Sequence, residues 1–512
     1  MRRWIRHMTM LLFMGNLVCG CSEWLHLEPE SELIREEFWQ TGDDVQAVVA
    51  GTYKELAGTV ERLFKWGELR GDLLVPGSNI SSMDRRIMDG FIYPENELNR
   101  WDKLYRTINF ANTVLKFSPV VVERDQTFNE NESRAFEAEA LFLRSLSYFY
   151  LVRIFRDVPL VLEASENDAQ DYYPVVSPEQ EIFQQIIDDL NTAVKGLPTS
   201  YGKLAYDKGR ATKSAAYALM ADVNLYYENY QACIDACDQI IHSGLFGLID
   251  GEDWFMNFFP GNSNESIFEI QFNKDLDQTN MLYQMLAPYP RDGTYPDGND
   301  EFRVSPYFVK EFEKNPSDRR AGNRTYLAFS GGGWYRFATS YVLWKFVGTE
   351  GTPSIVTGAA ASGYRIGNKE SDANWIVYRY PDILLMKAEA LVQLGGFQEA
   401  ANLLNQVRNR ALIPPAAETG NKNYLEDLIL EERAREFCGE GKRWFDLIRF
   451  GRRDNYARMD RLIEILAENK SYEEAQIIRS KYSNPDSWYL PIHQDEIDQN
   501  NMLEQNPYYI NQ

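Results

Sequence analysis

An internal repeat constrains the fold of this chain more than any other feature of its sequence. The segment Tyr230–Cys233 aligns with Phe397–Ala400, and each begins with an aromatic residue and has a small residue three positions later. Apolar residues follow in the same register one and two helical turns further on. Each segment comes after another stretch of helical periodicity, Ala211–Tyr227 in the first case and Tyr380–Leu394 in the second. Because the small residue lets a paired helix approach closely, the repeat predicts a scaffold of helix pairs.

This pattern is typical of the second helix of a tetratricopeptide unit. A third, weaker copy of the pattern occurs at Tyr472–Ala475. Cys233 and Cys237 lie one helical turn apart, a spacing that would also suit a metal pair or a disulfide. Both occupy small or apolar positions of the repeat, so we interpret them as packing residues. With Cys438 as the only other thiol beyond residue 21, we do not expect a fold held together by disulfides.

Helical periodicity also marks the first half of the chain. Apolar residues recur at helical spacing in residues 43–56, 98–117, 133–155 and 178–195. The sequence Asp157-Val158-Pro159 ends the third of these stretches. Together with the repeat, these stretches predict a mainly α fold.

Two regions interrupt the helical rhythm. Residues 67–95 are rich in Gly, Ser, Asn and Asp, and they predict a long ordered loop. Residues 251–374 are dense in Gly, Pro, Asn, Asp, Ser and Thr, with short β-like runs at Ile267–Phe272 and Tyr341–Phe346. We expect the second region to be an insert between two helical halves. Function concentrates in such loops because a rigid frame can hold them in place.

The first residues predict export and attachment to a membrane. Three arginines precede the apolar stretch Met8–Val18, which is shorter than the roughly 17–25 residues that cross a bilayer. Small residues then precede Cys21, which resembles the lipobox of bacterial lipoproteins, where cleavage is followed by acylation of the cysteine. Ordinary signal cleavage is the alternative, but it has no use for a cysteine at this point. We therefore predict lipidation of Cys21.

The charge balance limits the partners of the chain. It carries 53 basic and 76 acidic residues, for a formal net charge of −23. Nucleic acid is a poor partner for such a chain, because phosphates need a basic footprint. Neutral ligands such as glycans remain compatible. The aromatic content of 13% includes 30 Tyr, and Tyr and Trp offer a flat apolar face with a polar tip.

Familiar catalytic and cofactor signatures are missing from the sequence. The chain has four histidines and lacks the HExxH, GxSxG and GxxxxGK[ST] patterns. A glycine run at 331–333 lacks the strand-then-helix context of a nucleotide site. We expect no metal and no cofactor. A glycosidase-type carboxylate pair stays open as an alternative, because the acidic residues are too numerous for the sequence to single one out.

Six segments of the chain carry a resemblance to a known family. They are Ser22–Ser31, Trp101–Asn112, Glu137–Leu160, Tyr380–Ala390, Glu432–Leu447 and Leu490–Pro507. In this order they resemble the SusD/RagB family of outer-membrane nutrient-binding lipoproteins of the Bacteroidetes. The family usually has Gly where Arg156 stands, so the turn there is expected to differ.

The resemblance implies a function as well as a fold. Family members sit on the cell surface as a lid over a TonB-dependent, SusC-like transporter, bind a glycan or sometimes a peptide, and hand it down without breaking a bond. The resemblance thus implies a non-enzyme with a glycan ligand and a transporter partner. The expected organisation is a signal peptide, a lipidated tether, an N-terminal SusD-like helical half, a loop-rich ligand-binding insert and a C-terminal SusD/RagB helical half, over residues 1–20, 21–42, 43–250, 251–374 and 375–512.

The resemblance also places the ligand loops after the first helix and in the central insert. In this chain these are residues 67–95 and about 281–340. Aromatic residues there would stack on sugar rings, and polar residues would bind hydroxyl groups. The candidate stacking residues are Trp334, Tyr335, Tyr289 and Tyr295, and the candidate polar residues are Asn79, Arg86, Arg291 and Asp292.

Several charged or aromatic motif residues are better explained by structure than by ligand binding. Alternating charges on two expected helices predict ion pairs that lock the helices together. Trp101 and Trp444 are predicted to be packing residues. The charged residues in question are Glu436, Arg443, Asp446 and Arg449. Two alternatives to glycan capture remain, a scaffold that binds protein or peptide in its tetratricopeptide groove, and a hydrolase.

Overall fold

The computed structural model describes residues 38–165, 173–289, 298–321, 324–330, 339–349, 371–468 and 470–510. Over these residues the fold is mainly helical, as the sequence predicts, and it has four two-stranded antiparallel sheets. None of the described helices is both long and apolar enough to cross a membrane. Cys21 and most of the expected tether lie outside the described residues, so the lipidation site and the five-part organisation stay predictions.

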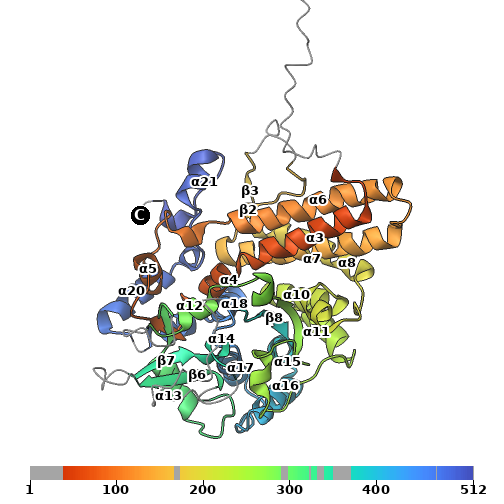
Figure 1. The fold of residues 1–512 in the computed structure, drawn as a ribbon. Helices are drawn as coiled ribbons and strands as arrows, with labels where there is room; N and C mark the ends of the chain where they lie inside the picture. Colours follow the sequence, from red (N-terminus) through yellow and green to blue (C-terminus); the bar gives the residue numbers. More distant parts are fainter. Residues whose placement is uncertain are drawn as a thin grey trace, which may run out of the picture.

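The first helices form a layered block (Figure 1). Helix α7 lies between α6 and α8, and α3 packs on α6. From Ala138 to Phe155 every residue of α7 is buried, which makes this helix the centre of the block. The helices and strands of this part are α3 (Gly42–Ala57), α4 (Val60–Glu68), α6 (Asp102–Arg124), α7 (Glu130–Phe155), β2 (Val158–Pro159), β3 (Val176–Ser177), α8 (Glu179–Gly196) and α9 (Leu204–Gly209).

The sequence repeat forms two stacked helix pairs. Helix α10 (Lys213–Tyr226) pairs with α11 (Tyr230–Ile241), and α15 (Tyr380–Gln393) pairs with α16 (Phe397–Arg410). Helix α11 packs on α15, so the two pairs stack although about 140 residues separate them in sequence. The small residues of the repeat, Cys233 and Ala400, are fully buried. All three described cysteines are free and buried, so the packing interpretation of Cys233 and Cys237 is confirmed.

The chain after the repeat wraps back over the first block. Trp101 and Trp444 are both buried, which confirms that they are packing residues. The weak third copy of the repeat pattern, at Tyr472–Ala475, differs from the other two. Tyr472 is 80% exposed, whereas Tyr230 and Phe397 are partly buried. The helices that follow the repeat are α17 (Lys422–Phe437), α18 (Arg443–Tyr456), α19 (Met459–Ala467), α20 (Tyr472–Tyr482) and α21 (Gln494–Gln499).

The central insert joins the scaffold through a short sheet. Strand β4 (Ser266–Ile270) pairs with β8 (Trp375–Arg379), so the two ends of the insert meet. Between them lie α12 (Leu282–Leu286), β5 (Phe302–Val304), α13 (Pro306–Glu313), β6 (Tyr326–Ser330), β7 (Thr339–Leu343) and α14 (Trp344–Val347). Short 3-10 helices occur at Glu97–Asn99, Trp254–Asn257, Lys274–Leu276, Pro485–Trp488 and Pro507–Tyr509.

Two expectations about these regions are wrong in detail. The β-like run Tyr341–Phe346 is a strand only as far as Leu343, after which α14 begins. All four residues of α14 are buried, and a short buried helix cannot be told from a buried strand by its apolar residues alone. The region 67–95 is not a continuous loop, since it contains β1 (Leu74–Pro76) and α5 (Ser82–Met88).

The backbone at Arg156 explains why the family usually has glycine there. Arg156 has φ 70° and ψ −78°, and the Asp157 N–H donates to the Phe155 carbonyl at 3.1 Å. This is the rare form of γ-turn with positive φ, which is strained for a residue that carries a side chain. The Arg156 side chain offsets part of this strain through ion pairs with Asp157 at 2.9 Å and Asp486 at 2.5 Å.

Candidate functional site

The two predicted ligand regions meet in a small antiparallel sheet. Strand β1 comes from the first region and pairs with β5 of the insert, with Leu74 opposite Val304. Beyond the sheet, the Gly77 N–H donates to the Glu301 carbonyl at 2.8 Å, and the Asn79 N–H donates to the Asp300 carbonyl at 3.2 Å. A Cβ atom at Gly77 would lie 2.0 Å from the Asp300 carbonyl oxygen, so this close approach requires glycine.

Asp300 ties the candidate residues Asn79 and Tyr289 to neighbouring backbone segments. Its carboxylate accepts from the Ser78 N–H at 3.2 Å and from the Arg303 guanidinium. Its own N–H donates to the Ala287 carbonyl at 2.9 Å, two residues before Tyr289. Asn79 is exposed and Tyr289 is 55% exposed. The structure therefore brings these two predicted residues, distant in sequence, to one part of the surface.

A β-hairpin lies beside this sheet. Strands β6 and β7 pair in register from Tyr326 opposite Leu343 to Ser330 opposite Thr339, and β7 packs against β5. Figure 1 shows the hairpin at one edge of the molecule, next to α13. Its connecting residues 331–338, with the predicted Trp334 and Tyr335, lie outside the described residues. The same holds for Tyr295, Arg291 and Asp292.

Helix α5 and the turn after it carry a further group of exposed residues. Arg86 is exposed, and its guanidinium lies 5.5 Å from the centroid of the Tyr93 ring. Tyr93 is 44% exposed, and Phe91 is 45% exposed. Arg86 is one of the residues predicted from the sequence, whereas Phe91 and Tyr93 are not, although their position between Gly90 and Pro94 is typical of an exposed loop.

Hydrogen bonds and an ion pair fix helix α5 and the turn after it to the scaffold. The Ser81 hydroxyl caps the helix by accepting from the Asp84 N–H at 3.0 Å. Asp84 also pairs with Lys65 of α4 at 3.1 Å, and the buried Lys481 ammonium donates to the Gly90 carbonyl at 2.6 Å. We call residues 77–93, β5, the hairpin β6–β7 and Tyr289 the ligand face, after the ligand contacts that the sequence predicts in these regions.

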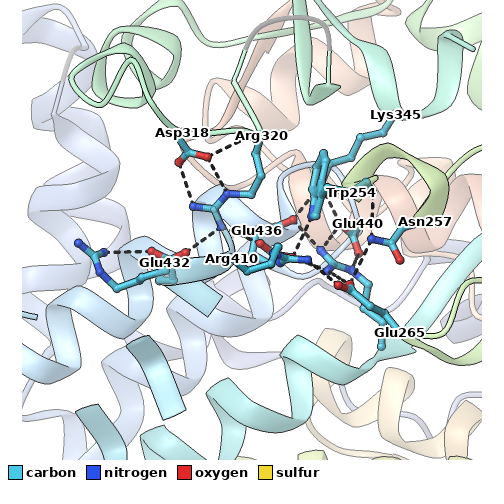
Figure 2. Close-up of polar contacts among 12 residues, drawn as sticks. Trp254, Asn257, Glu265, Asp318, Arg320, Lys345, Arg410, Glu432, Glu436 and Glu440 are labelled. Carbon is cyan, nitrogen blue, oxygen red and sulfur yellow. Dashed lines mark hydrogen bonds and ion pairs between the residues drawn. The ribbon is translucent and has the colours of Figure 1, made fainter. Parts of the chain in front are cut away.

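A buried ion network holds the hairpin in place (Figure 2). Arg320, which lies before β6, pairs with Asp318 at 3.0 Å, Glu432 at 2.7 Å and Glu436 at 2.6 Å. Lys345, which follows β7, pairs with Glu440 at 2.7 Å. Both cations are fully buried, so both ends of the hairpin are fastened to α17 and the residues after it.

The centre of the network is an arginine that meets three carboxylates. Arg379 pairs with Glu436 at 2.5 Å, Glu440 at 2.9 Å and Glu265 at 3.1 Å. Arg410 pairs with Glu265 and Glu436, both at 2.5 Å. Burial opposes ionisation of Glu436, but the adjacent Arg410, Arg379 and Arg320 guanidinium groups outweigh it and hold the pKa of this carboxyl well below its usual range.

The charges of this network balance. Its cations are Arg320, Lys345, Arg379, Arg408 and Arg410, and its carboxylates are Asp318, Glu265, Glu432, Glu436 and Glu440. The carboxylates of Glu265 and Glu436 are fully buried, so a ligand at the surface does not reach them. The network therefore has a structural role. The expectation that Glu436 forms ion pairs is confirmed.

The other charged motif residues also form ion pairs. Arg443 pairs with Asp72 at 2.6 Å, Asp446 with Arg433 at 2.8 Å, and Arg449 with Glu389 at 2.9 Å. All of these link α18 to other elements, as the alternating charges predict. No group of three or more potential metal ligands occurs in the described part of the chain.

The fold defines a class of protein, a scaffold of helix pairs that carries exposed loops on one surface. Comparisons with known proteins identify the family. Residues 323–509 match the SusD family, and residues 23–225 match a family described as starch-binding and associating with the outer membrane. The chain belongs to the SusD/RagB family of outer-membrane-associated proteins.

Individual relatives match over most of the chain. SusD-like protein P38 of Formosa agariphila is 29% identical over 476 residues, which cover 86% of this chain and 90% of the relative. The starch-binding protein SusD of Bacteroides thetaiotaomicron is 24% identical over 421 residues, covering 70% and 71%.

Solved structures share the fold. A SusD superfamily protein from Bacteroides vulgatus superposes with a TM-score of 0.74 at 21% identity, over 92% of this chain and all of that one. A laminarin-binding SusD-like protein gives a TM-score of 0.69 at 23% identity, over 91% and 99%.

Proposed function

We propose that this protein is a non-catalytic lipoprotein of the outer cell surface that captures a glycan on its ligand face. In this proposal Cys21 carries the lipid anchor, and the glycan passes to a SusC-like TonB-dependent transporter. The observation that carries the proposal is the pairing of β1 with β5. This pairing unites two sequence regions that display aromatic and polar side chains.

The chemistry of the ligand face suits a carbohydrate. A sugar ring has an apolar C–H face that stacks on an aromatic ring, and its hydroxyl groups need polar partners at the edge. Tyr289, Tyr93 and Phe91 are exposed rings, and Asn79 and Arg86 are exposed polar groups. The proposal keeps the sequence-predicted residues of the two adjoining segments, Trp334, Tyr335, Tyr295, Arg291 and Asp292, as further members of the face.

The relatives support the ligand class. One is named a starch-binding protein, and one structural neighbour is titled laminarin-binding. Both names describe glucans, which are neutral. A neutral ligand also agrees with the strongly acidic composition of this chain, since an acidic protein would repel a polyanionic glycan.

Electrophoresis in gels that contain different polysaccharides tests this proposal. The panel includes starch, laminarin and other neutral glycans, and wild type runs beside Trp334→Ala, Tyr295→Ala and Tyr289→Ala. Tyr472→Ala is the matched control, because Tyr472 is an exposed tyrosine on α20, outside the ligand face.

We expect at least one glycan to retard wild type and the control alike, and to retard the three ligand-face variants less. If no glycan retards the wild-type protein, the ligand class is wrong. If the variants run like wild type in the retarding gel, the ligand face is wrong. Release of shorter sugars from the glycan would instead support the hydrolase alternative.

A further inference from the structure

The structure also contains a cavity whose lining shares no residue with the ligand face. This cavity of about 580 Å³ is lined by three segments, which are the start of α6, the residues around β2 and β3, and α21 with the residues after it. Figure 1 shows these elements at the end of the molecule opposite β6 and β7. The cavity size falls in the range of about 300–1,000 Å³ that is usual for small-molecule sites.

Hydrogen bonds and an ion pair fix the walls of this cavity. The Tyr105 hydroxyl donates to the Pro159 carbonyl at 2.6 Å, which joins α6 to β2. The Asn500 amide donates to the Pro174 carbonyl at 2.8 Å, which joins the residues after α21 to those before β3. Arg100 pairs with Asp495 of α21 at 2.6 Å. The cavity is therefore formed by the folded chain rather than by a loose contact.

Flat apolar groups make up part of the lining. The rings of Tyr105 and Tyr173 and the rings of Pro159 and Pro174 all contribute. Tyr173 is 58% exposed, so its ring stands at the mouth of the cavity. Such groups can pack against the C–H face of a ring-shaped ligand.

Two polar groups of the lining have no partner within the described part of the chain. Trp101 is only 4% exposed, yet its indole N–H has no hydrogen-bond acceptor there. The Glu496 carboxylate has neither a cation nor a hydrogen-bond donor there. Burial raises the pKa of Tyr105 most, followed by the neighbouring Tyr148 and then by the negative charge of Glu496. The other carboxylate of the lining, Asp102, is already paired with Arg62 at 2.6 Å.

These groups select the chemistry of a ligand. No Lys, Arg or His occurs among the described residues that line the cavity, so an anionic ligand would meet two carboxylates and no cation. An ammonium group would satisfy Glu496 but has no acceptor for the Trp101 N–H. A hydroxyl group is both donor and acceptor, so a ligand with several hydroxyl groups can satisfy both at once.

We propose that this cavity is a second saccharide site that binds one or two neutral hexose units. One sugar face packs on the Tyr105 and Tyr173 rings, one hydroxyl group donates to Glu496, and another accepts from Trp101. The lining of this site shares no residue with the ligand face, and the proposal does not depend on the function proposed for that face.

Saturation-transfer NMR and calorimetry with maltose, cellobiose and laminaribiose test this proposal. The protein is the full chain after residue 20, carrying Tyr93→Ala and Tyr289→Ala to weaken the ligand face. In this background, Glu496→Gln removes the charged acceptor, and Trp101→Phe keeps a ring but removes the N–H. Asp498→Asn is the matched control, because Asp498 is an exposed carboxylate of α21 that does not line the cavity.

We expect at least one disaccharide to bind the background protein and the control equally. Glu496→Gln should weaken this binding about tenfold, since hydrogen bonds to charged groups are among the stronger ones. If Trp101→Phe does not fold, as judged by its thermal transition, Glu496→Gln alone decides. The proposal is overturned if none of the three disaccharides binds the background protein, or if Glu496→Gln binds as the control does.

Discussion

Among single residues, Arg379 lies at the centre of the ion network that joins the ligand face to the helical scaffold. This guanidinium is fully buried and contacts three carboxylates, Glu265, Glu436 and Glu440. Buried ion pairs contribute little net stability by themselves, but removal of one partner leaves an uncompensated charge in a medium that solvates it poorly. The network is therefore sensitive to any change that alters its charge balance.

We predict that Arg379→Met lowers the free energy of unfolding by about 3–5 kcal/mol. Urea denaturation followed by circular dichroism measures this. Arg319→Met is the control, because Arg319 pairs with the exposed Asp250 and Glu252 and its loss should cost about 1 kcal/mol or less. Equal effects of the two substitutions would contradict the role that we give to the network.

Lys481 lies beneath the ligand face and predicts a pH dependence. Burial and the nearby Arg70 guanidinium lower the pKa of Lys481 from 10.5 to about 7. In the unfolded chain the amine stays protonated up to about pH 10.5, so between pH 7 and 10.5 the unfolded chain binds more protons. This residue's contribution to stability is therefore complete above about pH 10.5 and is lost as the pH falls through about 7.

Lys481→Met should remove this dependence. Between pH 7 and pH 9, the rise in the free energy of unfolding with pH should become smaller by up to about 1.4 kcal/mol per pH unit. Urea denaturation across this range measures the slope, with the exposed Lys310→Met as control. An unchanged slope in Lys481→Met would show that Lys481 titrates normally in the folded protein.

At the scale of elements, the helix pairs depend on the small residues of the repeat. Ala400 of α16 is fully buried in the same position as Cys233 of α11, whose sulfur lies 3.9 Å from the Met386 carbonyl oxygen of α15. There is no room for a larger side chain where helices approach this closely.

Ala400→Leu should therefore lower the free energy of unfolding by about 1–3 kcal/mol through overpacking. Gln398→Leu, two residues away on the exposed side of the same helix, should change it by about 0.5 kcal/mol or less. Chemical denaturation of the two variants provides the measurement. If Ala400→Leu leaves the free energy of unfolding unchanged, the small residue of the repeat is not required for helix packing.

The elements also show what sequence could and could not predict. Periodicity located α7, α10 and α15 to within a few residues, because long amphipathic or buried helices repeat their signal over several turns. It missed β1, which has only three residues, and α5, which has seven, because neither is long enough to repeat a periodic signal. It also could not predict that β1 pairs with β5, because nothing local in residues 74–76 indicates a partner at 302–304.

The candidate site was predictable only in part for the same reason. Glycine and proline around Tyr289 and Tyr93 indicate displayed loops, yet only the fold brings Asn79 next to the segment that leads to Tyr289. The charges of Glu436 and Arg449 indicated ion pairs through their helical spacing. The partners of Glu436, Arg320 and Arg379, could not be predicted, since these come from the insert and from the strand that closes it.

At the scale of the whole molecule, the proposal requires the chain to stay on the membrane. Cys21→Ala should move the protein from the membrane fraction to the soluble fraction of cells that export it, because acyl chains contribute about 0.8 kcal/mol per buried CH₂. Fractionation and labelling with a radioactive fatty acid measure this. A labelled, membrane-bound Cys21→Ala protein would rule out Cys21 as the anchor, while its glycan binding in solution should match wild type.

Glycan capture by the ligand face is tested by the dissociation constant for a glycan that retards the wild-type protein. Isothermal titration calorimetry compares wild type with the variant that carries Tyr93→Ala and Tyr289→Ala, and with Tyr472→Ala. Loss of one aromatic stack of about 1.4 kcal/mol weakens binding about tenfold. We predict a dissociation constant at least about tenfold higher for the double variant and unchanged for Tyr472→Ala. A double variant that binds the glycan as tightly as wild type would contradict the account.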